Sequence, residues 1–453
     1  EPYYTVHVEG GSERSTEASH LTLLPEGWPP FAQLAPAVLA RTELGALGAD
    51  VGGVWEAAAT AAAAEGPPLP ARASAEALRY LVDCLAQEAR ALEPAVSVDV
   101  AAGARLAQLL CDAEVSGDGG GGPELLALLG RCLFAPHDSR ELVSAGAETL
   151  HKLLLGTVRT PAGDGAACAL ARCVARAEAP LLRLALGSAT SDEAAQRTLC
   201  ESLALAAARG AAPAAAVTLL RTALANLPDV TAGCAGPSES RRAVGAALLA
   251  GFLCAELAAG GGMGGDAMLT NATEAEAASV SAEAAARLAE LVEHRSPLVA
   301  CAATSAIGVV GAAAPLPLPE GMPAHEGEHA PSGASSDAPV PAPAPAAITK
   351  CSVVSTLCSL LKRDKIREAA VVSLGLIVSG DPHAAFRNDA LESLFGLGAT
   401  KDIDLHLSVG EALSRLADAD AGAPAGGTPA PPLPPIKVPE RPAIPSDLVT
   451  LAE

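Results

Sequence analysis

The chain is poor in aromatic residues and in positive charge. Of its 453 residues only 2% are Phe, Trp or Tyr, and 30 Lys and Arg stand against 52 Asp and Glu, a formal net charge of −22. Strong binding to a phosphate backbone needs clustered basic residues, which an acidic excess disfavours. The scarcity of aromatic rings also removes the platforms on which single-stranded bases stack. We therefore expect no nucleic-acid partner.

Residues that favour strands are scarce as well. Ile, Tyr, Phe and Trp are few, although half of the chain (50%) is apolar, and Ala, Leu, Glu and Arg predominate. This bias favours helices and argues against an all-β fold. The sequence predicts an all-α protein.

Secretory features are also lacking. The eleven cysteines include no Cys-x-x-Cys pair and are odd in number, and most lie in apolar helical runs. They are typical of reduced core residues. No basic segment followed by an apolar one is visible at the N-terminus. We expect the protein in the cytoplasm, with the nucleus as a second location.

One uncharged stretch needs a membrane check. No residue between Ser296 and Pro319 is charged. Its alanines and glycines contribute little to membrane insertion, and prolines begin at Pro315. The stretch therefore predicts a buried core helix, and we expect no membrane insertion.

Composition divides the chain into five parts. We expect an irregular N-terminal segment (1–30), Ala-rich HEAT-like helical repeats (31–314), a disordered Pro/Ala linker (315–347), further HEAT repeats (348–419) and a Pro-rich C-terminal tail (420–453). The two proline-rich parts cannot bury enough apolar surface to pack as helices.

Helix boundaries are marked between these breaks. Ser191 opens a run that should stop at Gly210, and Ser296 stands before Pro297, a capping residue before a proline at the first helical position. Ser238 and Thr273 open two further predicted helices, which reach residues 257 and 293. Short connections favour antiparallel neighbours.

A repeated pattern carries the strongest structural signal. Segments beginning at Val299, Ile366 and Leu405 each have an aliphatic start, a small or aliphatic residue four positions on, a small residue seven on and an aliphatic residue eight on. These offsets fall on one stripe of an α-helix. Weaker versions begin at three further positions: Leu142, Ala195 and Arg241.

The pattern favours a solenoid over a plain helical bundle. The starts at Ile366 and Leu405 are 39 residues apart, close to one two-helix HEAT repeat. Small residues in the stripe let a neighbouring helix approach closely. We therefore predict an α-solenoid of HEAT-like antiparallel helix pairs, interrupted by disordered Pro/Gly/Ala-rich linkers.

One string resembles a zinc-peptidase motif. His325-Glu326-x-x-His329 fits H-E-x-x-H, whose chemistry needs both imidazoles on one rigid helix with the glutamate as general base. Prolines and glycines surround the string, so a helix is not expected there. A zinc peptidase is kept as a distant alternative, and we expect no catalytic, cofactor-binding or metal-ligating residues.

The C-terminal repeats resemble a known family. Residues 365–375 (KIREAAVVSLG) look like a HEAT helix, and 391–397 (LESLFGL) precede 401–414 (KDIDLHLSVGEALS). This last passage is similar to one in the proteasome adapter and scaffold family (extracellular mutant twenty-nine type), in which an aromatic usually replaces Leu407. The resemblance covers roughly 55 residues, those from 362 to 416.

The resemblance implies a non-enzymatic scaffold. By resemblance, the partners are proteasome subunits of the core and the regulatory particle, and no catalytic residue or cofactor carries over. The alternative is another HEAT or armadillo interaction scaffold, of the transport-receptor or phosphatase-scaffold type. No partner-binding residue can be assigned by resemblance.

Overall fold

A computed structural model describes the helical part of the chain and a short N-terminal hairpin. The described residues are 3–8, 12–17, 31–32, 35, 71–92, 98–116, 121–134, 140–159, 170, 174, 178–187, 193–210, 213–231, 234, 236–260, 271–313, 350–379, 384–397 and 402–421. The predicted linker at 315–347 and residues 422–453 of the predicted tail lie outside this set.

The N-terminal segment contains an antiparallel β-hairpin, which differs from the irregular segment expected at 1–30. β1 (Tyr3–Val8) pairs with β2 (Ser12–Glu17), with Tyr3 opposite Glu17 and Val8 opposite Ser12. The first strand consists of aromatic and β-branched residues except for His7, and Gly10 and Gly11 follow it. The helix-rich average composition of the whole chain concealed this local pattern.

The rest of the described chain forms fourteen helices in seven consecutive pairs. The first helices of the pairs, called outer helices here, are α3 (Ala71–Leu92), α5 (Gly122–Leu133), α8 (Glu178–Ala185), α10 (Pro213–Ala225), α12 (Asn271–Leu291), α14 (Lys350–Leu360) and α16 (Ala384–Gly396). The second, called inner helices, are α4 (Val98–Ser116), α6 (Arg140–Arg159), α9 (Glu193–Gly210), α11 (Pro237–Gly260), α13 (Pro297–Ala313), α15 (Arg367–Ser379) and α17 (Ile403–Ala421). This arrangement confirms the predicted α-solenoid of antiparallel helix pairs.

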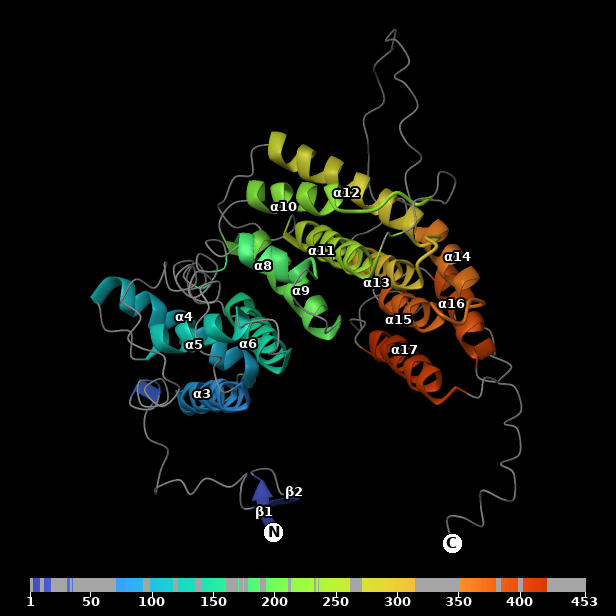
Figure 1. Ribbon diagram of the computed structural model, residues 1–453. Helices are drawn as coiled ribbons and strands as arrows, with labels where there is room; N and C mark the ends of the chain where they lie inside the picture. The colour runs from blue at the N-terminus through green and yellow to red at the C-terminus, as the bar shows by residue number, and fades with distance from the viewer. Residues whose placement is uncertain are drawn as a thin grey trace, which may run out of the picture.

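The inner helices form the continuous spine of the molecule. Each contacts the next along the series α4, α6, α9, α11, α13, α15 and α17, whereas direct contacts between outer helices are fewer. Figure 1 shows α10, α12, α14 and α16 along the outer side of the row, with α11, α13, α15 and α17 inside it. Closer packing on one side than on the other curves the row toward the inner helices.

Local sequence explains several helix ends. Helix α13 begins at Pro297 and α9 ends at Gly210, as predicted. Helix α17 is capped by Asp402, whose Oδ1 accepts hydrogen bonds from the backbone N–H groups of Asp404 and Leu405 at 3.1 and 3.3 Å. This side chain satisfies two of the donors that a helix start leaves without a partner.

The uncharged stretch after Ser296 is the buried helix α13. Its buried residues include Val299, Ala303, Ile307 and Val310, so the expectation of a core helix is confirmed. Within the residues that the structure describes, no helix has the length and apolar character needed to span a bilayer.

Candidate interaction surface

The three pattern segments predicted from sequence all lie on inner helices and face the preceding helix in the row. Their residues at positions 0, 4 and 7 are buried, and this set is called the signature face here: Val299, Ala303 and Ala306 on α13; Ile366, Ala370 and Ser373 at the start of and along α15; Leu405, Val409 and Ala412 on α17. The weaker versions beginning at residues 142, 195 and 241 also fall on inner helices, α6, α9 and α11.

On α11, α13 and α15 the opposite side of the helix receives the signature face of the next helix. We call it the notch face; it comprises positions 2, 5 and 9 of the same numbering. Gly308 on α13 lies against Ser373, and a Cβ added to it would come within 2.8 Å of the serine Cα. Gly375 on α15 lies against Ala412, where the corresponding distance to Cα is 3.0 Å. A side chain at either glycine would push two helices apart.

The same relationship extends to α11. A Cβ on Gly251 would lie 2.7 Å from the Cα of Ala306, the position-7 residue of α13. If Gly251 is position 9, like Gly308 and Gly375, then position 0 of α11 is Arg242. The sequence pattern places this start one residue earlier, at Arg241. Sequence analysis thus found the signature face but assigned no role to Gly308 and Gly375, which stand two residues after the small residue at position 7 on α13 and α15.

Hydrogen bonds cross these helix contacts. The buried Ser373 hydroxyl donates to the backbone carbonyl of Thr304 at 2.9 Å. The Cys301 thiol donates to the Lys365 carbonyl at 3.2 Å, and the exposed Ser408 hydroxyl donates to Glu368 Oε1 at 3.1 Å. These polar contacts link α13 to α15 and α15 to α17 at fixed positions along the helices, in addition to the close glycine contacts.

A buried glutamine joins three helices at the middle of the row. Gln196 on α9 is 3% exposed, and its Nε2 donates to the carbonyls of Ala185 and Arg241, both at 2.9 Å. Gly187 has φ +75°, a left-handed conformation suited to glycine, and ends the turn after α8. A Cβ on Gly245 would lie 2.6 Å from the Gln196 Nε2, so this glycine makes room for the amide.

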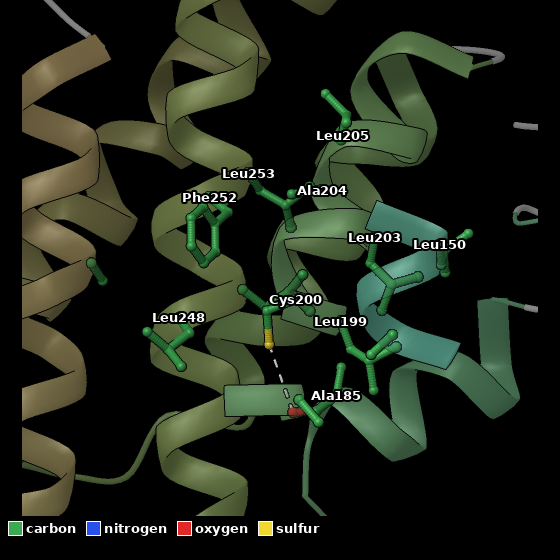
Figure 2. Close-up of a cluster of buried hydrophobic side chains, with 14 of the residues drawn as sticks. Leu150, Ala185, Leu199, Cys200, Leu203, Ala204, Leu205, Leu248, Phe252 and Leu253 are labelled. Carbon is green, nitrogen blue, oxygen red and sulfur yellow. Dashed lines mark hydrogen bonds between the residues drawn. The ribbon is translucent and has the colours of Figure 1, made fainter. Parts of the chain in front are cut away.

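Helix α9 is packed on both sides beside this junction. Figure 2 shows Leu199 and Leu203 lying toward Leu150 of α6, while Cys200 and Ala204 lie toward α11. The Cys200 thiol donates weakly to the carbonyl of Ala185 at 3.7 Å, the dashed line in Figure 2.

On α13, α15 and α17 the remaining side of the helix is open to solvent; we call this the inner face. Helical periodicity places there the residues six and ten positions after each start, and these are partly or fully exposed: Ser305 and Val309 on α13, Val372 and Leu376 on α15, Glu411 and Arg415 on α17. Leu298 lies on the same side of α13 and is 53% exposed. The inner face therefore changes from aliphatic at α13 and α15 to charged at α17.

Ion pairs link neighbouring repeats at the surface. Arg221 on α10 pairs with Glu276 on α12 at 2.6 Å. Arg363, in the turn after α14, pairs with Glu293, in the turn after α12. His151 on α6 lies 3.8 Å from Glu201 on α9. All of these side chains are at least partly exposed, so each pair adds little stability.

The described cysteines are buried or half-buried free thiols. Burial raises the pKa of Cys132 and that of Cys254 to about 12, from the ordinary 9.0. Burial also raises the pKa of Cys200, which is fully enclosed. Such thiols are poor nucleophiles at neutral pH.

The zinc-peptidase string lies outside the described residues, so His325 and His329 stay as a prediction only. Among the residues that are described, no group of three or more His, Cys, Asp or Glu side chains is placed to hold a metal ion.

Comparisons with known proteins add little to this geometry. No family model and no curated protein matches the chain. A solved structure described as an engineered protein, from a structural genomics consortium, is 17% identical over 86% of this chain and 99% of its own, with a TM-score of 0.23. A likeness at that level carries no argument about this chain. The fold that the packing establishes is a solenoid of helix pairs.

Proposed function

We propose that this chain is a non-enzymatic scaffold that binds the proteasome through the inner face of its solenoid. The observation that carries the proposal is the open inner face, where Leu298 is 53% exposed and Val309 and Val372, on the same side of α13 and α15, are partly exposed. Exposed apolar side chains gathered on one side of a molecule are typical of protein-interaction sites. A curved row of repeats supplies an extended surface on which many weak contacts add up.

The resemblance of residues 362–416 to the proteasome adapter and scaffold family supports the choice of partner. The KDIDLHLSVGEALS passage (401–414) includes Asp402, the capping residue of α17, and most of that helix. We place this scaffold in the cytoplasm or nucleus, where the free thiols of its core would stay reduced. The alternative partners are transport or phosphatase subunits, which other helical-repeat scaffolds bind.

Binding to purified proteasome core and regulatory particles tests the proposal. The full chain, immobilised by a tag, should bind at least one of the two particles. Leu298→Glu, which places a charge on the inner face, should weaken binding at least tenfold. The matched control is Ala282→Glu on the exposed side of the outer helix α12, which should change binding less than twofold.

Two results would count against the proposal. Absence of binding to either particle, together with co-purification of a transport GTPase or phosphatase subunits, would favour the alternative scaffold. An equal loss of binding in both variants would show that the inner face is not the binding surface. Circular dichroism and thermal melting of each variant check that the helices remain folded.

A further inference from the structure

Residues near the N-terminus pack as a helical turn against α3 and the start of α5. Phe31 is 1% exposed and Ala35 is 0% exposed, whereas Ala32 is exposed. Phe31 and Ala35 are four positions apart, so their side chains share one face of a helical turn. Both belong to the hydrophobic core that also contains Leu85 of α3 and Leu125 of α5. We call residues 31–35 the anchor segment.

Two features of the surface beneath it match the anchor segment. The Phe31 backbone N–H donates a hydrogen bond to Oε1 of Glu88 on α3. Gly121, directly before α5, has φ +91° and so holds a conformation that favours glycine. A Cβ on Gly121 would lie 2.9 Å from the Ala35 Cβ and 3.1 Å from the Phe31 Cε1. We call the surface around Glu88 and Gly121 the anchor site.

This contact differs from the contacts between successive inner helices. Helices α13 and α15 meet over more than one turn, with Gly308 against Ser373 and Gly311 against Ile377. The anchor segment instead presents one aromatic side chain, one small side chain four positions later and one hydrogen-bonded backbone group. Anchors spaced in this way are typical of a short helical peptide bound in a groove.

The anchor segment is distant in sequence from the helix on which it lies. Residues 36–70 separate it from the first residue of α3. A tethered ligand competes with an outside one through its effective concentration at the site, which falls as the tether lengthens. An outside ligand that makes the same contacts can therefore compete with the anchor segment.

We infer that the anchor site is a peptide-binding site, which the chain's own anchor segment occupies until a segment of another protein replaces it. The replacing segment carries an aromatic residue followed four positions later by alanine or glycine. Contact with Gly121 requires the small residue, and the buried position of the Phe31 ring requires the aromatic one. The site lies on outer helices and is separate from the inner face, through which proteasome binding is proposed.

A peptide of the chain's own sequence is the probe. Residues 27–38 (GWPPFAQLAPAV), synthesised with a fluorescent label, are titrated with the full 453-residue chain and with its Phe31→Ala variant. The anchor segment occupies the site in the wild type, whereas the variant lacks the aromatic anchor. We therefore expect saturable binding to the variant, at least tenfold tighter than binding to the wild type. Circular dichroism and thermal melting check that the variant remains folded.

Altered peptides identify the contacts. A Phe31→Ala peptide should not bind, and N-methylation of the Phe31 nitrogen, which removes the donor to Glu88, should weaken binding at least fivefold. Ala35→Leu should weaken binding at least tenfold, because the longer side chain collides with Gly121. The matched control is Ala32→Leu at the exposed position, which should change binding less than twofold.

A second experiment does not depend on the stability of the variant. A protease site inserted between residues 53 and 54 allows the folded chain to be cut between the anchor segment and α3. The fragment with residues 1–53 should stay bound during gel filtration, and excess unlabelled peptide should release it. Release before the peptide is added, or retention in its excess, would overturn the inference.

Three results of the titration and of sedimentation would also overturn the inference. Equal binding to the wild type and to the Phe31→Ala variant would place the peptide elsewhere on the molecule. Absence of saturable binding to the folded variant would make the anchor segment a fixed part of the core. A dimer that the Phe31→Ala substitution dissociates would make the occupant the same segment of a second copy.

Discussion

Gly308 and Ser373 meet where α13 and α15 cross, at a distance that admits no side chain on the glycine. A Cβ there would lie 2.6 Å from both the Cβ and the Oγ of the serine. Ser373 in turn donates its hydroxyl hydrogen to the Thr304 carbonyl, one helical turn before the glycine. The close approach and the hydrogen bond together set both the spacing and the register of two successive repeats.

Replacing this glycine should destabilise the solenoid. We expect Gly308→Ala to lower the free energy of unfolding by about 1–3 kcal/mol, because the new methyl group overpacks the contact with the Ser373 backbone. The measurement is urea unfolding followed by circular dichroism.

Gly410→Ala is the matched control for that substitution. Gly410 holds the corresponding side of α17, where an added Cβ meets nothing within 4 Å. Alanine there should raise stability by about 0.5–1 kcal/mol through its better helix propensity. A cost at Gly410 equal to that at Gly308 would contradict the role assigned to close helix approach.

The buried amide of Gln196 should be needed for stability at the middle of the row. Gln196→Leu keeps the approximate volume but removes the donor to the carbonyls of Ala185 and Arg241. We expect the free energy of unfolding to fall by about 2–4 kcal/mol, because both carbonyls would lose the hydrogen bond that they accept from the neutral amide. The control is Gln108→Leu, whose amide makes only an exposed bond to Asp112 and should cost less than about 0.5 kcal/mol.

The two serines that cross helix contacts should differ in their effects. Ser373→Ala removes a buried hydrogen bond and should cost about 0.5–1.5 kcal/mol. Ser408→Ala removes an exposed bond to Glu368 and should be nearly neutral, because water replaces the lost partner. Chemical unfolding measures the free energy of unfolding of the two variants side by side. An equal loss of stability in both would contradict the prediction that only the buried hydrogen bond matters.

Raised thiol pKa values predict a loss of stability at alkaline pH. In the folded chain the pKa of Cys132 and that of Cys254 are raised to about 12 from the ordinary 9.0, by burial. As pH rises, the thiols ionise in the unfolded chain before they ionise in the folded chain, and this stabilises the unfolded state relative to the folded one. Their contribution is complete below pH 9 and is lost as pH rises toward about 12.

Alkylation provides a direct reading of the same thiols. At pH 8 the native chain should be modified by iodoacetamide at Cys132 and Cys254 at least about a hundredfold more slowly than at the half-exposed Cys234. Mass spectrometry of the digested protein assigns each rate to its cysteine. Comparable rates at the three positions would mean that the core around α5 and α11 opens readily.

Much of the fold follows from the sequence because a solenoid repeats one local rule. The segments beginning at Val299, Ile366 and Leu405 could be placed on one helical stripe from spacing alone, and the structure buries that stripe on α13, α15 and α17. The helix start at Pro297 and the stop at Gly210 followed from local capping chemistry.

Other features depend on neighbours that spacing does not reveal. The role of Gly308 becomes clear only when the serine opposite it is known, because a glycine inside a helix can also be a residue that the helix merely tolerates without any packing role. The polarity of Gln196 predicts exposure, whereas its three-helix position buries it. The hairpin of β1 and β2 was missed because whole-chain composition outweighed the strand-favouring residues of β1.

The contact between α13 and α15 also joins parts of the chain that are far apart in sequence. Gly308 and Ser373 are separated by the whole stretch 314–349, which no described helix occupies. If a protease cut that stretch, the two fragments would still share a dry, hydrogen-bonded interface. The molecule is therefore suited to reassembly from two separately produced pieces, through the contacts of α13 with α14 and α15.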